Sequence, residues 1–209
     1  GYFKPSGHLV IIDRIKDLAK TSNGVQYSPQ YIENKLKFSS FIGEAVILGK
    51  DKPYLSAIIC IRFSIVSKWA EQQGYGFTNY TSLSALPEVY QKLTKEVEKV
   101  NATLPDAQKI NKFILLYKEL DADDGELTRT RKVRRTVIAD KYGDLIESIY
   151  DNKEMVDIDT VITFQDGGSS RIQTQLKVAT VIKSDGENNG KSDGNADSST
   201  SSQNQRKAS

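Results

Sequence analysis

The stretch EAVILGKDKPYLSAIICIRF, residues 44–63, contains two apolar segments separated by a short polar turn. The segments are of strand length, and the turn GKDKPY contains a glycine, an aspartate and a proline, residue types that commonly end strands. This arrangement predicts a β-hairpin. Because both segments are apolar along their length, we expect the hairpin to lie at the centre of the fold.

Segments with helical or strand periodicity flank this hairpin on both sides. The apolar spacing predicts helices at 29–39, 64–74, 86–101 and 136–150, and further strands at 8–13 and 112–120. Pro29 and Pro87 stand near the start of two of these helices, where the missing N–H is tolerated. Mixed strands and helices of this kind predict an α+β domain of about 150 residues, with a central antiparallel sheet or hairpin flanked by helices.

The periodicity changes after Tyr150. In RIQTQLKV, residues 171–178, apolar or threonine side chains alternate with polar ones, and VDIDTVITF, residues 156–164, alternates in the same way. The intervening QDGGSS is turn chemistry, so residues 151–182 are predicted to form an appended β-hairpin. Residues 183–209 are rich in Ser, Asn, Asp and Gly, and a segment of this composition is expected to be a disordered polar tail.

The bulk composition limits the classes of function. The chain of 209 residues has 29 Lys and Arg against 27 Asp and Glu, a net charge of +2, which is low for a protein held to nucleic acid or anionic lipid by charge. A lone cysteine, Cys60, fits a reducing cytoplasm, and with His8 as the single histidine no zinc site is expected. The chain has no apolar stretch of membrane-spanning length. Because it opens without Met in a strand-like segment, we expect it to be part of something larger.

The stretch DADDGELTRTRKVRR, residues 121–135, places acidic residues directly before five basic residues in seven positions. It allows three interpretations: a weak phosphate-backbone patch, the solvated start of a helix at Arg134 and Arg135, or a reactive-site lysine. The acidic residues upstream weaken the local positive field, and no aromatic residues are interleaved to stack bases. From the residues alone, Lys132 is one cation among several.

The stretch DRIKDLAKTSNGVQYSP, residues 13–29, contains the turn pair Asn23-Gly24. Glycine permits a positive φ and a close approach of the backbone to a ligand. An ordinary connection between a strand and a helix would use the same residues, so both interpretations remain open.

Taken in order, IIDRIKDLAKTSNGVQYSPQYIE at 11–33 and the basic stretch followed by VIADKYGDLIESIY at 137–150 resemble two motifs of one family. The chain resembles the C-terminal lid domain of the adenylate-forming (AMP-binding) superfamily, specifically bacterial long-chain fatty acid–CoA ligases, over about residues 8–150. Two motifs in the correct order at a domain-sized separation are more specific than either alone.

This resemblance implies an ATP-dependent acyl-CoA synthetase. A fatty acid and ATP give an acyl-adenylate and pyrophosphate, and CoA then displaces AMP. ATP and Mg²⁺ are bound mainly by the enzyme's own N-terminal domain, over which the lid closes for the first step before rotating for the second. The resemblance also implies that the isolated lid is inactive. It predicts a cytoplasmic protein and leaves peripheral contact with the inner membrane face open.

Matching motif positions imply four site residues and no metal ligand. Lys132 corresponds to the catalytic lysine of adenylation and Arg14 to the arginine that binds the nucleotide. Lys16 occupies the hinge position, and Gly24 lies on the loop that lines the CoA pantetheine channel. Arg131 replaces a residue that is often smaller or apolar in the family, so no role is carried onto it.

The implied organisation has four parts. Residues 1–13 are the end of a preceding domain and the hinge strand, 14–150 the lid domain, 151–182 the appended hairpin, and 183–209 the tail. Two alternatives remain: the lid of an adenylate-forming ligase for another carboxylic acid, and a nucleic-acid-binding module that uses the basic run 129–135.

Overall fold

The computed structural model describes residues 2–3, 5–10, 17–151, 153–163 and 169–182. Two of the predicted site residues, Arg14 and Lys16, lie outside the described residues, as do residues 11–13 of the expected strand at 8–13. The predicted tail 183–209 also lies outside them.

A four-stranded sheet with the strand order β10-β7-β6-β5 forms the centre of the molecule. Its strands are β5 (Ile42–Leu48), β6 (Leu55–Ile61), β7 (Ile110–Leu115) and β10 (Ala179–Thr180). β5 and β6 pair antiparallel, which confirms the predicted hairpin, but β7 lies parallel to β6. The sheet is therefore mixed. The parallel pairing of β6 and β7 requires a long connection, and the helices between the two strands provide it.

Four helices accompany one face of the sheet: α1 (Pro29–Lys37), α2 (Phe63–Gln73), α3 (Tyr80–Ser84) and α4 (Pro87–Asn101). The Ser28 hydroxyl caps α1 by accepting a hydrogen bond from the Tyr31 N–H at 3.1 Å. α2 ends at Gly74, as predicted, and the Gly74 backbone is left-handed, which is common for a glycine that follows a helix. A short helix, η2 (Asp106–Gln108), precedes β7.

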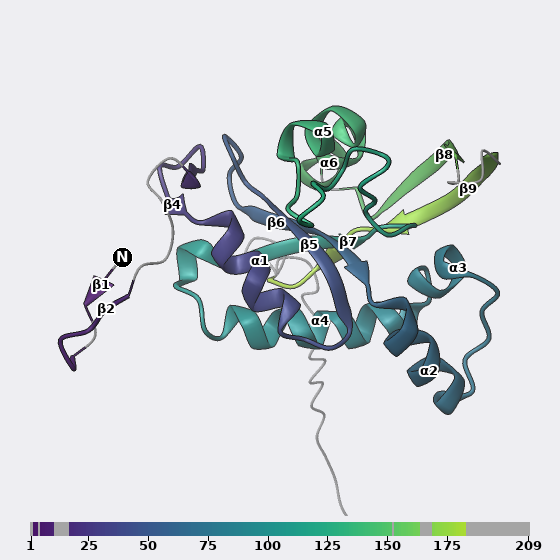
Figure 1. Ribbon diagram of the computed structural model, residues 1–209, viewed down its shortest axis with the longest axis horizontal. Helices are drawn as coiled ribbons and strands as arrows, with labels where there is room; N and C mark the ends of the chain where they lie inside the picture. Colours follow the sequence, from purple (N-terminus) through teal and green to yellow (C-terminus); the bar gives the residue numbers. More distant parts are fainter. Residues whose placement is uncertain (1, 4, 11–16, 152, 164–168, 183–209) are drawn as a thin grey trace, which may run out of the picture.

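The opposite face carries α5 (Arg135–Lys141) and α6 (Gly143–Tyr150) (Figure 1). β6 is buried on both faces: Ala57 and Ile59 join the core under α1 and α4, while Ile58 and Cys60 join the core under α5 and α6. This two-sided burial explains why the strand is apolar at successive positions.

The single helix expected at 136–150 is two helices that meet at Tyr142. The Tyr142 backbone, with φ −114° and ψ 20°, is not helical, and its buried hydroxyl donates to Glu126 at 2.6 Å. The apolar stripe continues across the break, which is why periodicity alone predicts one helix. A tertiary hydrogen bond, together with the poor helix former Gly143, divides it.

β8 (Met155–Thr163) and β9 (Ser169–Lys177) form the predicted antiparallel hairpin, which extends away from the main sheet (Figure 1). Its inner face carries Val156, Ile158 and Ile172, which pack on the core beneath α5 and α6. Arg171 and Asp159 pair on the opposite, exposed face.

Two small sheets lie near the start of the chain: β1 (Tyr2–Phe3) with β2 (Leu9–Val10), and β3 (Ala19–Lys20) with β4 (Gln26–Tyr27). The α+β class predicted from the sequence is confirmed. In the part of the chain that the structure describes, no helix is both long and apolar enough to cross a membrane.

Candidate functional site

Lys132 lies on a tight loop between β7 and α5, residues 127–133, which we call the Lys132 loop. A bridge between Leu127 and Val133 closes the loop. Thr128 then holds the Lys132 backbone from both sides: its N–H donates to the Lys132 carbonyl at 2.8 Å, and its hydroxyl accepts from the Lys132 N–H at 3.0 Å. The backbone is therefore fixed while the Lys132 side chain is exposed.

Arg131, at the tip of this loop, has a left-handed backbone with φ 57°. Its N–H donates to the Thr128 carbonyl at 2.8 Å, which closes a turn directly before Lys132. A side chain with a Cβ adopts this conformation at a cost on the order of 1–2 kcal/mol, which glycine avoids.

Glu126 anchors the N-terminal side of the Lys132 loop. Its carboxylate is fully buried and accepts hydrogen bonds from Lys118 at 2.8 Å, the Tyr142 hydroxyl at 2.6 Å and the Asp121 N–H at 2.9 Å. Lys141 pairs with it at 2.8 Å. Burial of the carboxyl opposes its ionisation, but the hydrogen bonds from Lys118, Lys141 and Tyr142 outweigh this and hold its pKa below the ordinary value.

Glu33 of α1 anchors the C-terminal side of the loop. Both of its carboxylate oxygens accept from Nη2 of Arg135 at 2.7 Å, and one also accepts from the Ile47 N–H at 2.8 Å. Burial raises the pKa of Glu33, and the Arg135 guanidinium opposes that rise. Arg135 is thus committed to a buried carboxylate, which differs from the solvated helix start considered from the sequence.

A cavity of about 620 Å³ opens beside the Lys132 loop, between it, α1 and the start of the β3–β4 segment. Of the described residues that line it, six are cationic and three are acidic: Lys20, Lys37, Lys50, Arg131, Lys132, Arg135, Asp17, Glu33 and Asp51. An excess of positive charge in a concave site favours an anionic ligand. In the described part of the chain, no group of three or more His, Cys, Asp or Glu side chains is arranged to hold a metal ion.

Gly24 lies in the turn between β3 and β4, with φ +83°, so the turn uses a conformation that favours glycine. The turn is tied to the β5–β6 connection by hydrogen bonds from the Ser22 N–H to the Lys52 carbonyl and from the Asp51 N–H to the Lys20 carbonyl, both 3.0 Å. Gly24 is not among the residues that line the cavity. The structure therefore brings Lys132 together with residues 17–20 and not with Gly24.

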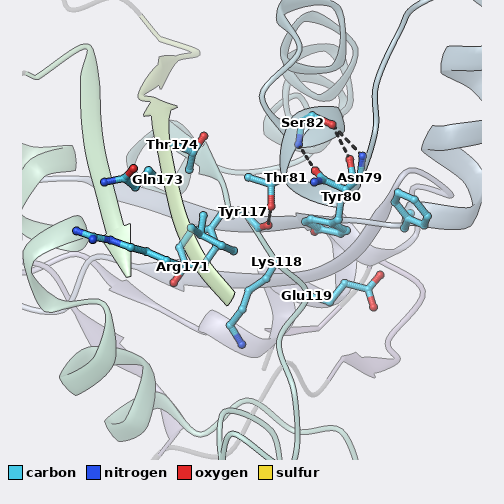
Figure 2. A pocket seen from close by; sticks show the side chains of 12 residues that line it. Asn79, Tyr80, Thr81, Ser82, Tyr117, Lys118, Glu119, Arg171, Gln173 and Thr174 are labelled. Atoms are coloured by element: carbon cyan, nitrogen blue, oxygen red, sulfur yellow. Dashed lines mark hydrogen bonds between the residues drawn. The ribbon is translucent and has the colours of Figure 1, made fainter. Parts of the chain in front are cut away.

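A second cavity, of about 720 Å³, lies between α3, residues 117–119 and β9 (Figure 2). Lys118, which contributes to its lining, is already paired with Glu126, and Arg171 is paired with Asp159. None of the predicted site residues lines this cavity. The cavity beside Lys132 is therefore the better candidate for chemistry.

Sequence reasoning did not identify the two anchors, Glu126 and Glu33. The acidic run before Lys132 was the available signal for Glu126, but acidic residues in such a run are usually solvated. Glu33 stands 102 positions before its partner Arg135, and a pair so distant in the sequence leaves no local pattern.

The chain is an α+β domain with a lysine-bearing loop beside a cationic cavity. Residues 16–154 match the family model described as the AMP-binding enzyme C-terminal domain, and the chain belongs to this family.

Relatives with curated descriptions support this assignment. The long-chain-fatty-acid–CoA ligase FadD15 of Mycobacterium tuberculosis is 32% identical over 155 residues, which cover 74% of this chain and 26% of that protein. The long-chain-fatty-acid–CoA ligase heimdall of Drosophila melanogaster is 23% identical over 188 residues, covering 72% and 28%. The chain spans about a quarter of the length of the curated relatives it matches.

A solved structure has the same fold. The adenylation domain of the carboxylate reductase from Mycobacterium chelonae superposes with a TM-score of 0.54 at 18% identity, covering 72% of this chain and 24% of that chain. At this identity the likeness concerns the fold alone.

Proposed function

We propose that the chain is the C-terminal part of an ATP-dependent long-chain fatty acid–CoA ligase. Family membership and the names of the relatives support this, and their greater length fits a partner domain that precedes the lid. The chain would close over the ATP and fatty-acid site for acyl-adenylate formation and rotate for thioester formation with CoA. Such closure excludes water and completes a site that neither part holds alone, so the isolated chain is expected to be inactive.

One observation carries this proposal: the Lys132 backbone is held rigidly while its ammonium stays exposed beside a cationic cavity. The ammonium makes no ion pair within the described part of the chain. A lysine is a compact charge on a flexible stem, so it can meet both the fatty-acid carboxylate and the α-phosphate as negative charge gathers between them. Loss of such a group typically lowers the rate about 10²–10³-fold.

The other assigned residues complete the proposal. Arg14 binds the nucleotide, Lys16 is the hinge, and Gly24 presents the loop that lines the pantetheine channel in the second step. The separation of Gly24 from the Lys132 cavity fits two lid poses that use different surfaces.

The substrates divide between the two parts of the proposed enzyme. The excess of cations in the described lining of the cavity suits phosphate oxygens, and the Mg²⁺ that accompanies ATP is assigned mainly to the preceding domain. The division into residues 1–13, 14–150, 151–182 and 183–209 stays part of this proposal, together with a cytoplasmic location and contact with the inner membrane face.

The test uses the complete protein, expressed with the coding region upstream of Gly1, and measures palmitate-dependent ATP–pyrophosphate exchange. We expect strong exchange in the parent and a loss of about 10²–10³-fold in Lys132→Ala. Arg129→Ala is the matched control, because Arg129 is exposed on the same loop and does not line the cavity.

The outcomes separate the parts of the proposal. A parent without palmitate-dependent exchange would contradict the fatty-acid assignment, and exchange with other carboxylic acids would then identify a related ligase. Exchange that survives Lys132→Ala would show that the enzyme is a ligase whose adenylation residue lies elsewhere.

A further inference from the structure

Arg131 has a positive φ, a backbone conformation that glycine adopts more easily than arginine. Of the described residues, only Arg131 and Asp51 have a positive φ without being glycine. The hydrogen bonds that close the Lys132 loop, from Arg131 to Thr128 and between Thr128 and Lys132, engage no atom of the Arg131 side chain. Glycine would form the same turn without strain, so the turn itself gives no reason for a guanidinium.

The Arg131 side chain lines the same cavity as Lys132. Of the other cations of that lining, Arg135 pairs with Glu33 and Lys37 pairs with Glu44, while Lys20 and Lys50 make no ion pair within the described residues. Within the described part of the chain, Arg131 has no carboxylate partner. Among the described lining residues, Arg131 is thus the guanidinium that is not paired with a carboxylate, and it lies directly beside the ammonium of Lys132 in the sequence.

We propose that Arg131 binds the pyrophosphate portion of ATP and so contributes to recognition of the triphosphate. This inference rests on the proposed function. In adenylation a carboxylate oxygen forms a bond to the α-phosphorus, the bond from that phosphorus to the bridging oxygen of the β-phosphate breaks, and its electron pair leaves with pyrophosphate. With Lys132 acting at the α-phosphate, the next anionic groups along the substrate are the β- and γ-phosphates. A guanidinium binds such paired oxygens bidentately.

This role has a kinetic signature. Contacts with the β- and γ-phosphates are made to ATP and to pyrophosphate but not to AMP or the acyl-adenylate, and CoA, which has phosphates of its own, enters only in the second lid pose of the proposed function. Removal of the guanidinium should therefore weaken ATP and pyrophosphate alone. A loop that was merely distorted would also slow the second half-reaction or lower the melting temperature.

The experiment measures both half-reactions of the complete protein in Arg131→Gly, Arg131→Lys and the control Arg129→Ala. Palmitate-dependent exchange is followed at varied ATP and pyrophosphate, and palmitoyl-CoA formation is followed from preformed palmitoyl-adenylate and CoA. We expect Arg131→Gly to raise KM for ATP and for pyrophosphate about tenfold, the scale of one charge-assisted contact. Thioester formation should change less than about twofold. Arg131→Lys should be intermediate, because it keeps the charge and loses the fork, and Arg129→Ala should match the parent.

Melting temperatures separate recognition from structure. Arg131→Gly should melt above an Arg131→Ala variant made for this comparison, because only glycine relieves the positive φ. An active parent whose Arg131→Gly variant has unchanged KM values would overturn the assignment, as would equal losses in both half-reactions with a lowered melting temperature. A parent that gives no palmitate-dependent exchange would overturn the proposed function, and this assignment with it.

Discussion

The Lys132 loop and the β8–β9 hairpin both rely on charged side chains that pair across two segments, but they bury those pairs very differently. At the loop, the carboxylates of Glu126 and Glu33 are 0% and 5% exposed. On the hairpin, Arg171 and Asp159 are 65% and 48% exposed. The two regions therefore offer the same chemistry in two dielectric environments.

The difference concerns what each pair can do. When an exposed ion pair forms, each charge gives up contacts with water for contacts with its partner, so the pair adds little to the free energy of unfolding. A buried carboxylate with several donors is costly to leave unpaired, so its partners are held in fixed positions. The buried pairs can define where the Lys132 loop lies, and the exposed pair cannot define the hairpin, whose position depends on the apolar contacts of its inner face.

The largest expected effect is at Glu126. Glu126→Ala would leave Lys118 and Lys141 with Asp124 alone and the Tyr142 hydroxyl without its acceptor. Breaking a buried ionic cluster by removing one partner costs about 3–5 kcal/mol. Urea denaturation should show a fall in the free energy of unfolding of that size.

Glu119→Ala is the matched control for this variant. Glu119 is exposed and lies next to Lys118 in the sequence, so its removal should change the free energy of unfolding by less than about 0.5 kcal/mol. Equal effects of the two substitutions would contradict the anchoring role of Glu126.

A smaller effect is expected at Glu33. Glu33→Ala removes the acceptor of the Ile47 N–H and frees Arg135, whose side chain is 41% exposed and can be rehydrated. The unsatisfied buried N–H should cost about 1–3 kcal/mol in free energy of unfolding. Glu71→Ala, at an exposed position on α2, should be close to neutral in the same denaturation series. A loss at Glu33 no larger than at Glu71 would show that the buried pair is not an anchor.

Protonation of Glu126 should contribute to the loss of stability at acid pH. Its folded-state pKa lies below the ordinary value of 4.5, so the unfolded chain takes up the proton first as pH falls. The stabilisation is complete above pH 4.5 and is lost as pH falls through the folded-state pKa. Glu126→Gln cannot titrate, so the difference in unfolding free energy between the parent and this variant should shrink below pH 4.5. A difference that is constant over this range would contradict the assigned shift.

Much of this fold was predictable because it is encoded locally. The spacing of apolar residues and the positions of turn residues predict several elements: strands β5 and β6, the end of α2 at Gly74, and the hairpin of β8 and β9. The parallel position of β7 was not predictable in this way, because it depends on where a long connection returns. The break at Tyr142 depends on a hydrogen bond to Glu126, whose burial no local pattern reveals.

The same distinction applies to the site. Lys132 was identified by resemblance of its motif, and the structure adds that Thr128 holds its backbone and that the cavity collects positive charge. The sequence alone does not decide whether Arg135 is solvated or paired. Only the fold, by bringing α1 against the start of α5, decides that it pairs with Glu33.

The smallest expected effect is on the hairpin. Asp159 accepts hydrogen bonds from Arg171 and Gln173, and these contacts hold its pKa at about 2, yet the whole group faces solvent. Because water competes for each partner and salt screens the charges, Asp159→Ala should leave the melting temperature of the chain unchanged within error. Ile158→Ala, which removes an apolar side chain from the opposite face of the same strand, should lower it. If Asp159→Ala destabilised the chain as much as Ile158→Ala, the hairpin would depend on its exposed charges, and the contrast with the Lys132 loop would fail.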